Sequence, residues 1–368
     1  MKKVLFVAST GSHILNFHIP YIRQFKELGW GVSVACGEDI KDISVADYTL
    51  PLPFTKRMSS PRNLSAMLRL RRHICSKGYD LMICHTSLAA FFARAALFGM
   101  KNRPAVCNMV HGYLFDDDTP ALKRFILTAA EKLTAPVTDL LIAMNAYDLD
   151  YARHKRLAAR TEFVFGIGLD RHPSTVDEKN DGKALRSRLG FGADKFLLLY
   201  AAEFSKRKSQ ATLISALSSL PEDVILLLPG KGALLDDCRE LAMQLGLEDR
   251  VVFPGHIRDM SPWYLAADAA VSASRSEGIP FNLLEAMHYG LPMVASQVKG
   301  HTDLIEDSVS GLLFPFGDSD ACAKAILRLK SDHDFADSMT AKAKEQVEKY
   351  RLSQVLPQVM ELYLSVKP

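Results

Sequence analysis

Short apolar runs that alternate with helix-like segments are the feature that most limits how this chain can fold. The runs KVLFVAS (3–9), GVSVAC (31–36) and LMICHT (81–86) are continuous rather than alternating. Continuous runs of this length are typical of strands buried on both faces, as in parallel sheets covered by helices. The segments between them, at 19–29 and 87–99, carry apolar residues at helical spacing. The pattern predicts a doubly wound α/β domain.

The same alternation begins again in the second half of the chain, with strand-like runs at 196–202, 224–230, 250–255, 269–274 and 292–296. The segment DRHPSTVDEKNDGK (170–183), between the two halves, is polar and shows no periodicity. We therefore predict domains at 1–172 and 183–349, joined by a linker at 173–182. The apolar tail at 350–368 is expected to form a helix that crosses back to the first domain.

Composition excludes several classes of protein. A length of 368 residues suits two domains, and a net charge of +3 does not by itself indicate a nucleic-acid-binding protein. No run reaches the roughly 18–20 uncharged apolar residues of a membrane-spanning helix, and MKKVLFVAST lacks the pattern of a signal peptide. The six cysteines are scattered without a CxxC pair. These features favour a cytoplasmic protein with reduced thiols.

Ligands of open parallel sheets bind beyond the carboxyl ends of the strands, so the loops there are the candidate sites. In the first half these loops contain Gly11, His13, His18, His85 and His111. Gly11 can let the backbone approach a ligand, and the sequence His111-Gly112 ends a strand. Each histidine can equally be a structural residue, although His111 fits a functional position best.

Two other ligand types receive no support in this half. The loop STGSHILNFHIP (9–20) has one glycine instead of the GxGxxG fingerprint, which disfavours an NAD-dependent dehydrogenase. The acidic run Asp116–Asp118 could bind a metal, but a surface turn is favoured because no second carboxylate cluster or histidine pair completes a site. We expect no metal site.

In the second half, FSKRKSQ (204–210) places three cations in a strand-to-helix loop beside a helix N-terminus. Such a loop can bind an anion, with Lys208 as the best candidate, or it can be a solvated charge run. The turn PGKG (229–232) contains Gly230 and could admit a ligand. The backbone of PGHIRD (254–259), at His256 and Ile257, could contact the edge of a base.

The stretch SEGIPFNLLEAMHYG (276–290) follows another predicted strand and reads as a loop and a helix that starts near Pro280. The first helical amides, at Phe281, Asn282 and Leu283, could hold a phosphate. The carboxylates of Glu277 and Glu285 would repel that phosphate but accept hydrogen bonds from hydroxyls. A diphosphate with a polyhydroxy group at each end, as in a nucleotide sugar, matches this pattern.

Residues 196–318, with Lys208, PGKG, LGLEDRVVFPGHIRD and the SEGIPFNLLEAMHYG stretch, resemble the family-4 glycosyltransferases, which have the two-Rossmann GT-B fold. The first half, with SHILNFHIP and VHGYLF, resembles the branch that makes bacterial capsule, exopolysaccharide or O-antigen. The resemblance implies two domains that face each other across a cleft. It also implies a retaining transfer from a nucleotide sugar that requires no metal or other cofactor.

The resemblance also implies roles for single residues. Glu285 would bind the ribose, Lys208 would neutralise the leaving diphosphate, and His111 would face the donor sugar. Glu277 would contact that sugar, and the backbone of Gly278, Ile279 and Pro280, with the amides that follow Gly278, would hold the donor. Gly11 would lie near the diphosphate, and His13, His18 and His85 would bind the acceptor. Many relatives carry an arginine where this chain has Glu203, so one phosphate-binding cation is missing, and Lys206 or Arg207 could replace it. Glu203 itself could bind the donor or contact the acceptor.

A basic segment suggests where the acceptor comes from. Residues 53–79 contain seven Lys and Arg and no Asp or Glu, and a helix carrying Arg69, Arg71 and Arg72 could lie on an anionic membrane. A solvated helix face is the competing interpretation. A second helix-like stretch at 121–133 mixes cations with apolar residues. A lipid-diphosphate-linked acceptor, as the resemblance implies, would place the protein at the inner face of the plasma membrane.

Two other functions remain open. A nucleotide-sugar epimerase could use the same scaffold and would need no acceptor. A non-catalytic subunit that binds a nucleotide sugar for a partner transferase would explain Glu203 in place of arginine. The resemblance favours UDP over GDP as the nucleotide.

Overall fold

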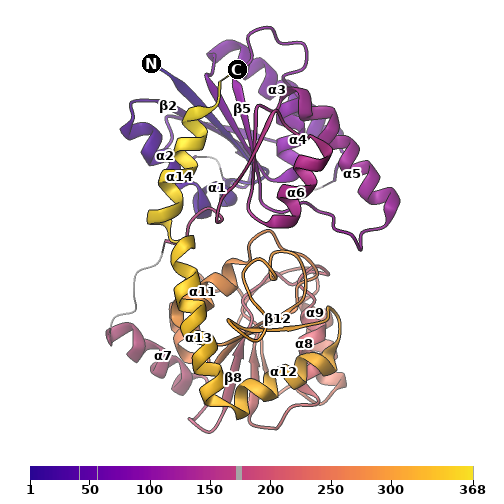
Figure 1. Ribbon diagram of the computed structural model, residues 1–368, viewed down its shortest axis with the longest axis vertical. Coiled ribbons are helices and arrows are strands. Elements are labelled where there is room, and N and C mark those ends of the chain that lie inside the picture. Colours follow the sequence, from indigo (N-terminus) through magenta and orange to yellow (C-terminus); the bar gives the residue numbers. More distant parts are fainter. Residues whose placement is uncertain (41, 56, 171–175, 368) are drawn as a thin grey trace. The chain divides into compact units, whose positions relative to one another are not determined.

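The computed structural model describes residues 1–40, 42–55, 57–170 and 176–367. The chain divides into two compact units, each built around its own parallel sheet. The first unit is Met1–Gly168 with Leu352–Pro368, and the second is Leu169–Arg351. The predicted pair of doubly wound α/β units is confirmed (Figure 1).

The sheet of the first unit has the strand order β3-β2-β1-β4-β5-β6-β7, with every neighbouring pair parallel. Its strands are β1 (Lys3–Val7), β2 (Gly31–Gly37), β3 (Tyr48–Leu52), β4 (Leu81–His85), β5 (Ala105–Val110), β6 (Leu140–Ala143) and β7 (Arg160–Phe163). The central strands β4 and β5 are buried along their whole length, which is why their sequences are continuous apolar runs. The edge strands β3 and β7 are half-exposed and more polar, so the sequence pattern did not reveal them.

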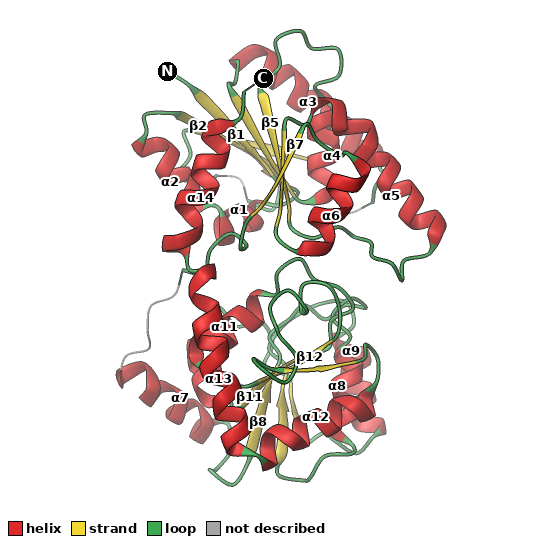
Figure 2. Cartoon of the chain, in the orientation of Figure 1, coloured by secondary structure: helices red, strands yellow, loops and turns green. Residues whose placement is uncertain are grey.

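Helices cover both faces of this sheet (Figure 2). They are α1 (Gly11–Phe17), α2 (Ile19–Glu27), α3 (Pro61–Lys77), α4 (Ser87–Ala95), α5 (Ala121–Thr134), α6 (Ala146–Lys155) and α14 (Leu352–Ser365), with a short 3₁₀ turn at Ala135–Val137. A buried ion pair fixes α5 to α4: Arg94 Nη2 lies 2.9 Å from Glu131 Oε2, and Arg94 also donates to the oxygens of Ala90 and Thr138. Arg94 is therefore a structural residue of the core.

The C-terminal helix α14 packs on α2 in the first unit (Figure 1). Tyr363 lies against the rings of Tyr21 and Phe25, with ring centroids 6.1 and 6.2 Å apart. At the start of the helix, a side chain at Gly168 would lie 2.7 Å from the Cα of Leu352, so glycine permits the close approach of the two segments.

The sheet of the second unit has the order β10-β9-β8-β11-β12-β13 and is also parallel throughout. Its strands are β8 (Phe196–Leu199), β9 (Val224–Leu227), β10 (Val251–Val252), β11 (Ala269–Ser272), β12 (Met293–Ser296) and β13 (Leu312–Phe314). Its helices are α7 (Val176–Arg188), α8 (Gln210–Leu217), α9 (Leu235–Gln244), α10 (Ser261–Ala266), α11 (Phe281–Tyr289), α12 (Ser319–Ser331) and α13 (His333–Val347), followed by a 3₁₀ turn at Glu348–Tyr350.

The predicted linker at 173–182 is wrong where the structure describes it, because helix α7 starts at Val176; residues 173–175 lie outside the described residues. Helix α7 packs on α10, and Arg186 near its end donates to Asp268 (3.0 Å) and to the carbonyl oxygen of Ala266 (3.1 Å). These contacts stabilise a helix whose polar sequence has no apolar periodicity of its own.

The strand order places one crevice in each sheet. In the first sheet, strands β1 to β3 are added outward in one direction and β4 to β7 in the other, so the strand order switches between β1 and β4. In the second sheet it switches between β8 and β11. Ligands of doubly wound sheets bind at such switch points, outside the carboxyl ends of the strands. The loops after these four strands are therefore where the site residues are expected.

Candidate functional site

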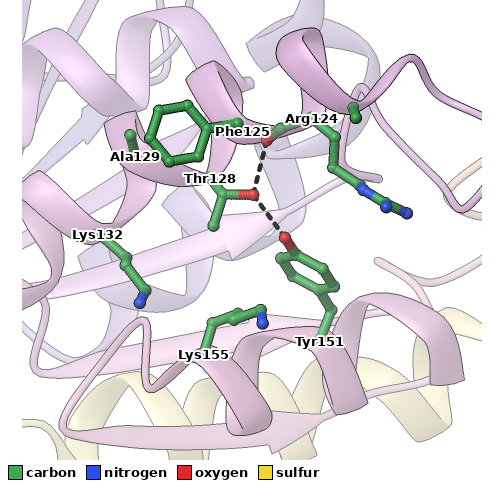
Figure 3. Close-up of a pocket in the computed structure, with 8 residues that line it drawn as sticks. Arg124, Phe125, Thr128, Ala129, Lys132, Tyr151 and Lys155 are labelled. Atoms are coloured by element: carbon green, nitrogen blue, oxygen red, sulfur yellow. Dashed lines mark hydrogen bonds between the residues drawn. The ribbon is translucent and has the colours of Figure 1, made fainter.

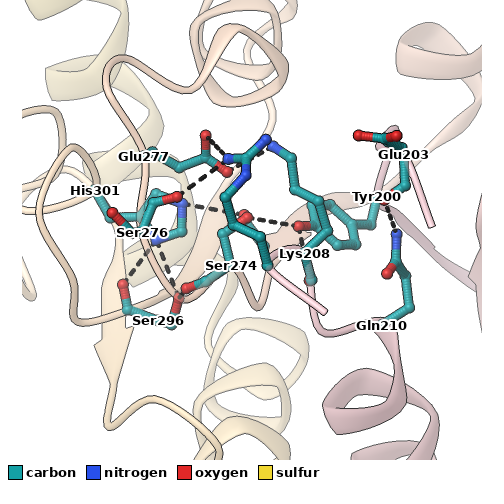
Figure 4. A network of polar contacts seen from close by, with 11 residues as sticks. Tyr200, Glu203, Lys208, Gln210, Ser274, Ser276, Glu277, Ser296 and His301 are labelled. Atoms are coloured by element: carbon teal, nitrogen blue, oxygen red, sulfur yellow. Dashed lines mark hydrogen bonds and ion pairs between the residues drawn. The ribbon is translucent and has the colours of Figure 1, made fainter. Parts of the chain in front are cut away.

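An ionised group lies at the switch point of the second sheet, formed by Glu277 after β11 and by Arg207 and Lys208 after β8 (Figure 4). Lys208 Nζ lies 2.5 Å from Glu277 Oε1, and Arg207 Nη1 lies 2.8 Å from Glu277 Oε2. Glu277 is only 7% exposed, whereas the side chain of Arg207 is 46% exposed. The carboxylate thus positions two cations side by side, one of them open to solvent.

The charge state of Glu277 follows from these contacts. Burial would raise the pKa of Glu277, but the charges of Lys208 and Arg207 outweigh it and lower the pKa to about 2. The carboxylate is therefore ionised at neutral pH and leaves the pair of cations with one net positive charge. A positive group at the carboxyl edge of a parallel sheet can bind a phosphate-containing ligand.

Arg207 and Glu203 both lie in the loop after β8, and Glu203 is exposed. Its carbonyl oxygen accepts a hydrogen bond from Gln210 (2.9 Å). Arg207 pairs with the same carboxylate as Lys208, so it is the candidate in this loop for the cation that position 203 lacks.

Buried polar residues that the sequence patterns did not single out support this group. The hydroxyl of Tyr200 lies 2.8 Å from Ser274 Oγ and donates to the carbonyl oxygen of Lys208 (3.0 Å), which fixes the Lys208 backbone. His301, after β12, is fully buried; its ring nitrogens lie 3.1 Å from Ser272 Oγ and 2.7 Å from the carbonyl oxygen of Ser296. The signal that could have found His301 is its place just after a buried strand.

Gly300 explains how the loop with Glu277 can pack so closely. Gly300 has φ +82°, and a Cβ there would lie 2.7 Å from the carbonyl oxygen of Glu277. The amide of Glu277 donates to the carbonyl oxygen of Lys299 (3.2 Å). A side chain at position 300 would therefore push the Glu277 loop away from the cations.

Helix α11 begins after Pro280, as expected, and ends at Gly290 with φ +74°. One predicted phosphate ligand is wrong, because the amide of Leu283 donates to the carbonyl oxygen of Pro280 (3.0 Å) and closes the first helical turn. Gly278 and Pro280 are buried, while Ile279, Phe281 and Asn282 are half-buried. The amides at Phe281 and Asn282 remain predicted phosphate ligands.

Glu285 lies one turn into α11 and is held by a tyrosine that sequence reasoning missed. The hydroxyl of Tyr264 donates to Glu285 Oε2 (3.0 Å) and lies 3.1 Å from the carbonyl oxygen of Asn282. The Tyr264 ring is buried and stacks on Tyr289 with a centroid distance of 5.3 Å. This contact fixes the direction of the Glu285 carboxylate, as a group that clamps a ligand hydroxyl requires.

The glycines of PGKG serve the protein's own packing. A Cβ at Gly230 would lie 2.0 Å from the carbonyl oxygen of Ala202, and one at Gly232 would lie 2.2 Å from that of Phe204. Gly230 thus lets this loop contact the backbone at 202–204. His256 is exposed and Ile257 is half-buried in the loop after β10.

Four histidines meet at the switch point of the first sheet: His13 and His18 after β1, His85 at the end of β4, and His111 after β5. One ring nitrogen from each lies within 4.8 Å of those of the others. His13 Nε2 lies 3.2 Å from His18 Nε2, and His85 Nδ1 lies 3.1 Å from His111 Nε2. The rings of His18 and His85 stack with centroids 3.7 Å apart.

This histidine group is electrically neutral. Burial lowers the pKa of His13 to about 4 and holds the pKa of His111 well below its ordinary range. Burial and the neighbouring histidines do the same for the pKa values of His18 and His85. His18 and His85 have no exposed surface, so in this structure neither presents an atom to an acceptor, whereas His13 and His111 are half-buried.

The backbone at Gly11, where the sequence predicted that a ligand could approach, is already in contact with other residues of the protein. The amides of Gly11 and Ser12 donate to the carboxylate of Asp39, at 2.7 and 3.1 Å. A Cβ at Gly11 would lie 2.6 Å from the Cβ of Ile40. The small residue is therefore needed for packing, and its amide already has an anionic partner.

The remaining sequence candidates lie apart from both groups. The favoured surface turn at Asp116–Asp118 is present: Thr119 Oγ1 donates to Asp116 Oδ1 (2.7 Å), and Arg124 pairs with Asp117 (3.3 Å). Arg71 is a structural residue, because its guanidinium donates to the carbonyl oxygens of Ala96 (2.6 Å) and Phe98 (2.8 Å). Arg69 and Arg72 are exposed on α3.

Two protein families match the two units in order. Residues 21–166 match the glycosyl transferase 4-like domain, and residues 181–346 match the glycosyl transferases group 1. The putative glycosyltransferase EpsD of Bacillus subtilis (strain 168) is 30% identical to the chain over 98% of this chain and 96% of its own length. The chain is a family-4 glycosyltransferase.

Other known proteins agree with this assignment. The UDP-Gal:α-D-GlcNAc-diphosphoundecaprenol α-1,3-galactosyltransferase of Escherichia coli is 24% identical over 80% of this chain and 77% of its own. Anabaena HepE, solved in complex with UDP-glucose, superimposes with a TM-score of 0.79 at 21% identity, with both chains fully covered. Sucrose-phosphate synthase from Thermosynechococcus elongatus gives 0.79 at 21% identity over 99% of this chain and 98% of that one. These likenesses place the transferase in the GT-B fold.

Proposed function

We propose that this transferase moves a sugar from a UDP-sugar to a lipid-diphosphate-linked saccharide, with retention of anomeric configuration, in the synthesis of a cell-surface polysaccharide. The Glu277 group with Arg207 and Lys208 carries the proposal, because it presents positive charge where a nucleotide diphosphate would leave. The names of the Escherichia coli galactosyltransferase and of the HepE complexes with UDP support the choice of UDP over GDP.

In this proposal the residues of the second unit divide the donor between them. Lys208 and Arg207 stabilise the negative charge that grows on the departing diphosphate. Glu285, oriented by Tyr264, accepts hydrogen bonds from the ribose hydroxyls. Glu277 holds the two cations and accepts a hydrogen bond from the donor sugar. None of these roles calls for a metal ion, since the cations are side chains.

The sugar is transferred by attack of the acceptor hydroxyl on the same face that the diphosphate leaves. The leaving phosphate oxygen takes the proton of the acceptor hydroxyl, so no enzyme nucleophile is needed. His111 faces the donor sugar and His13 faces the acceptor, since these are the half-buried members of the histidine group. Both are neutral imidazoles at pH 7, so each can donate or accept a hydrogen bond with a hydroxyl.

The position of Arg207 weighs against the non-catalytic alternative. That alternative rested on the missing cation at position 203, and Arg207 supplies a cation beside Lys208. No contact in the described residues favours an epimerase over a transferase.

Helix α5 is where we place the contact with the membrane that carries the acceptor. Leu122, Phe125, Ile126 and Leu133 lie at helical spacing and are 57 to 73% exposed. No described helix is long and apolar enough to span a bilayer. An exposed apolar stripe on a helix that also carries Lys123 and Lys132 is typical of a helix lying at an anionic membrane surface.

A basic groove runs beside this stripe, between α5 and α6 (Figure 3). It encloses about 320 Å³ and is lined by Arg124, Lys132 and Lys155 together with Thr128 and Tyr151. The hydroxyls of Thr128 and Tyr151 lie 2.5 Å apart. Cations and hydroxyls in one groove suit the phosphate of an anionic lipid. By contrast, α3 offers Arg69 and Arg72 but a smaller exposed apolar surface.

Calorimetric titration of the full chain with UDP, GDP, ADP and NAD tests the donor assignment. Wild type should bind UDP most tightly, and Glu285→Ala should lose most of that affinity. Glu248→Ala, which removes an exposed glutamate elsewhere in the second unit, is the matched control and should bind like wild type. Equal UDP binding by wild type and Glu285→Ala would overturn the ribose clamp.

Sedimentation with phosphatidylglycerol vesicles tests the membrane contact. Wild type should sediment with the vesicles, and the double variant Leu122→Ser, Phe125→Ser should stay in the supernatant. The comparator is Arg69→Glu with Arg72→Glu, which leaves the structural Arg71 in place. Loss of sedimentation only in the arginine variant would assign the membrane contact to α3. A dimer that forms without vesicles would mean that the exposed face of α5 binds a second copy of the chain.

A further inference from the structure

The histidine group of the first unit has more ligand capacity than the proposed transfer uses. His13, His18, His85 and His111 come from three separate segments, yet one ring nitrogen from each lies within 4.8 Å of the others. The transfer needs only the half-buried His13 and His111. Nothing in the proposed chemistry explains why two further histidines are buried behind them.

The spacing of the ring nitrogens approaches that of a metal site. In a tetrahedral zinc site with Zn–N bonds of about 2.0–2.1 Å, ligand atoms lie about 3.3 Å apart. The pairs His13–His18 and His85–His111 are already at 3.2 and 3.1 Å. Small ring rotations would bring the two pairs around one ion.

Two ring nitrogens of the buried members lack partners. His18 Nδ1 and His85 Nε2 are buried and make no hydrogen bond in the described part of the chain. A buried polar atom without a hydrogen-bond partner is unfavourable, and both of these nitrogens are in that state. These are the ring atoms opposite His18 Nε2 and His85 Nδ1, which make the 3.2 and 3.1 Å contacts, so within the described residues no hydrogen bond on the far side holds either ring in its orientation.

We propose that His13, His18, His85 and His111 form a binding site for a divalent transition-metal ion of the zinc type. Imidazole is a preferred ligand of such ions, and no carboxylate belongs to the group, which disfavours calcium or magnesium. The ion joins the loop after β1 to the ends of β4 and β5. It takes no part in the transfer step, and its occupancy withdraws His13 and His111 from the substrates.

Titration of tag-free, chelator-treated full chain with Co²⁺ tests the site directly. Tetrahedral Co²⁺ with nitrogen ligands absorbs visible light, and Zn²⁺ should displace it and abolish the absorption. We expect one ion per chain. His13→Gln or His111→Gln should weaken binding more than about 100-fold, since even partners of ligands cost about 10- to 100-fold.

The controls separate this site from adventitious binding. His154→Gln removes an exposed histidine from α6 in the same unit and should bind Co²⁺ like wild type. Cys75→Ser removes the exposed thiol and should also have no effect. The half-buried His13 and His111 are chosen because their loss disturbs the core least, and circular dichroism confirms that each variant is folded.

Absence of the absorption in folded wild type, or its persistence in both His13→Gln and His111→Gln, would overturn the metal site. Neither result touches the donor assignment, since UDP binding is measured separately and depends on the second unit.

Discussion

The two switch points of this transferase have the same topology and opposite chemistry. At the first, four neutral imidazoles gather after β1, β4 and β5. At the second, an ionised carboxylate holds two cations after β8 and β11. The same sheet edge can therefore be made neutral or charged by the loop residues alone. The contrast fits a division of labour in which the second unit holds the anionic donor and the first unit holds uncharged hydroxyls.

The first unit also contains a buried ion pair that serves its core. Its buried ion pair, Arg94 with Glu131, ties α4 to α5. Substitutions that change one group at a time test whether the two units differ in this way. The chain offers a convenient reporter for each unit, because its two tryptophans are Trp30 in the first unit and Trp263 in the second.

The largest effect is expected for Arg94→Met. It leaves Glu131 buried without its cation, so the unfolding free energy of the first unit should fall by about 3–5 kcal/mol. Urea denaturation followed by Trp30 fluorescence, in a Trp263→Phe background, measures this. Arg62→Met, which removes an exposed pair with Glu38, is the control and should cost about 1 kcal/mol or less. A slower transfer with unchanged stability would mean that this charge belongs to the site after all.

Lys208→Ala should reduce the turnover number of sugar transfer by about 10²- to 10³-fold, because it removes a group that stabilises the leaving diphosphate. The measurement is steady-state transfer with the preferred UDP-sugar. Lys206→Ala is the matched control, since Lys206 is exposed in the same loop, whereas the cations that pair with Glu277 are Arg207 and Lys208. Equal losses in the two variants would show that the loop acts only through its overall charge.

Between pH 6.5 and 4, acid should destabilise the first unit more than the second, because the first holds the group of four histidines with lowered pKa values whereas the second holds His301. The histidines have folded pKa values below their ordinary 6.5, so the folded first unit binds fewer protons, and its stability falls as the pH drops below about 6.5 toward 4. Glu277 has a folded pKa of about 2 against 4.5, so its contribution is complete above pH 4.5 and is lost as the pH falls toward 2.

Urea denaturation from pH 7 to pH 4, followed separately by Trp30 and Trp263, measures these ranges. Trp30 should report the larger loss of stability, and the loss should shrink in His13→Gln. If Trp263 instead reported the larger loss, the assignment of neutral and ionised groups would be reversed.

The smallest effect is expected for Tyr264→Phe. Removing one hydroxyl that orients Glu285 should weaken UDP binding about threefold to tenfold, the equivalent of a single hydrogen bond. Calorimetry measures this, with Tyr147→Phe as a control that removes a hydroxyl bonded to the exposed Asp117 in the first unit. Unchanged binding in Tyr264→Phe would mean that Glu285 is held by its helix alone.

The sequence predicted what depends on local pattern. Continuous apolar runs identified the central strands, and their order predicted two doubly wound sheets with polar residues at the carboxyl ends. Edge strands such as β3 and β7 escaped because half-exposed strands lack such runs. Helix α7 escaped because contacts with α10, rather than periodicity, stabilise it.

Partnerships between distant residues could not be predicted from pattern. Arg207 pairs with Glu277, 70 positions along the chain, only because the loop after β8 places it there. Tyr264, His301 and the meeting of the four histidines depend in the same way on tertiary packing. Gly11 and Leu283 show the reverse case, in which amides predicted to be available are bonded by Asp39 and Pro280.

Amide hydrogen exchange of the full chain, with and without UDP, tests the division between the two units most directly. The account predicts slower exchange in peptides that cover 204–210 and 274–289 in the second unit, and little change at 9–18 and 105–112 in the first. Protection confined to the first-unit peptides, with none in the second unit, would contradict the assignment of the donor to the Glu277 group.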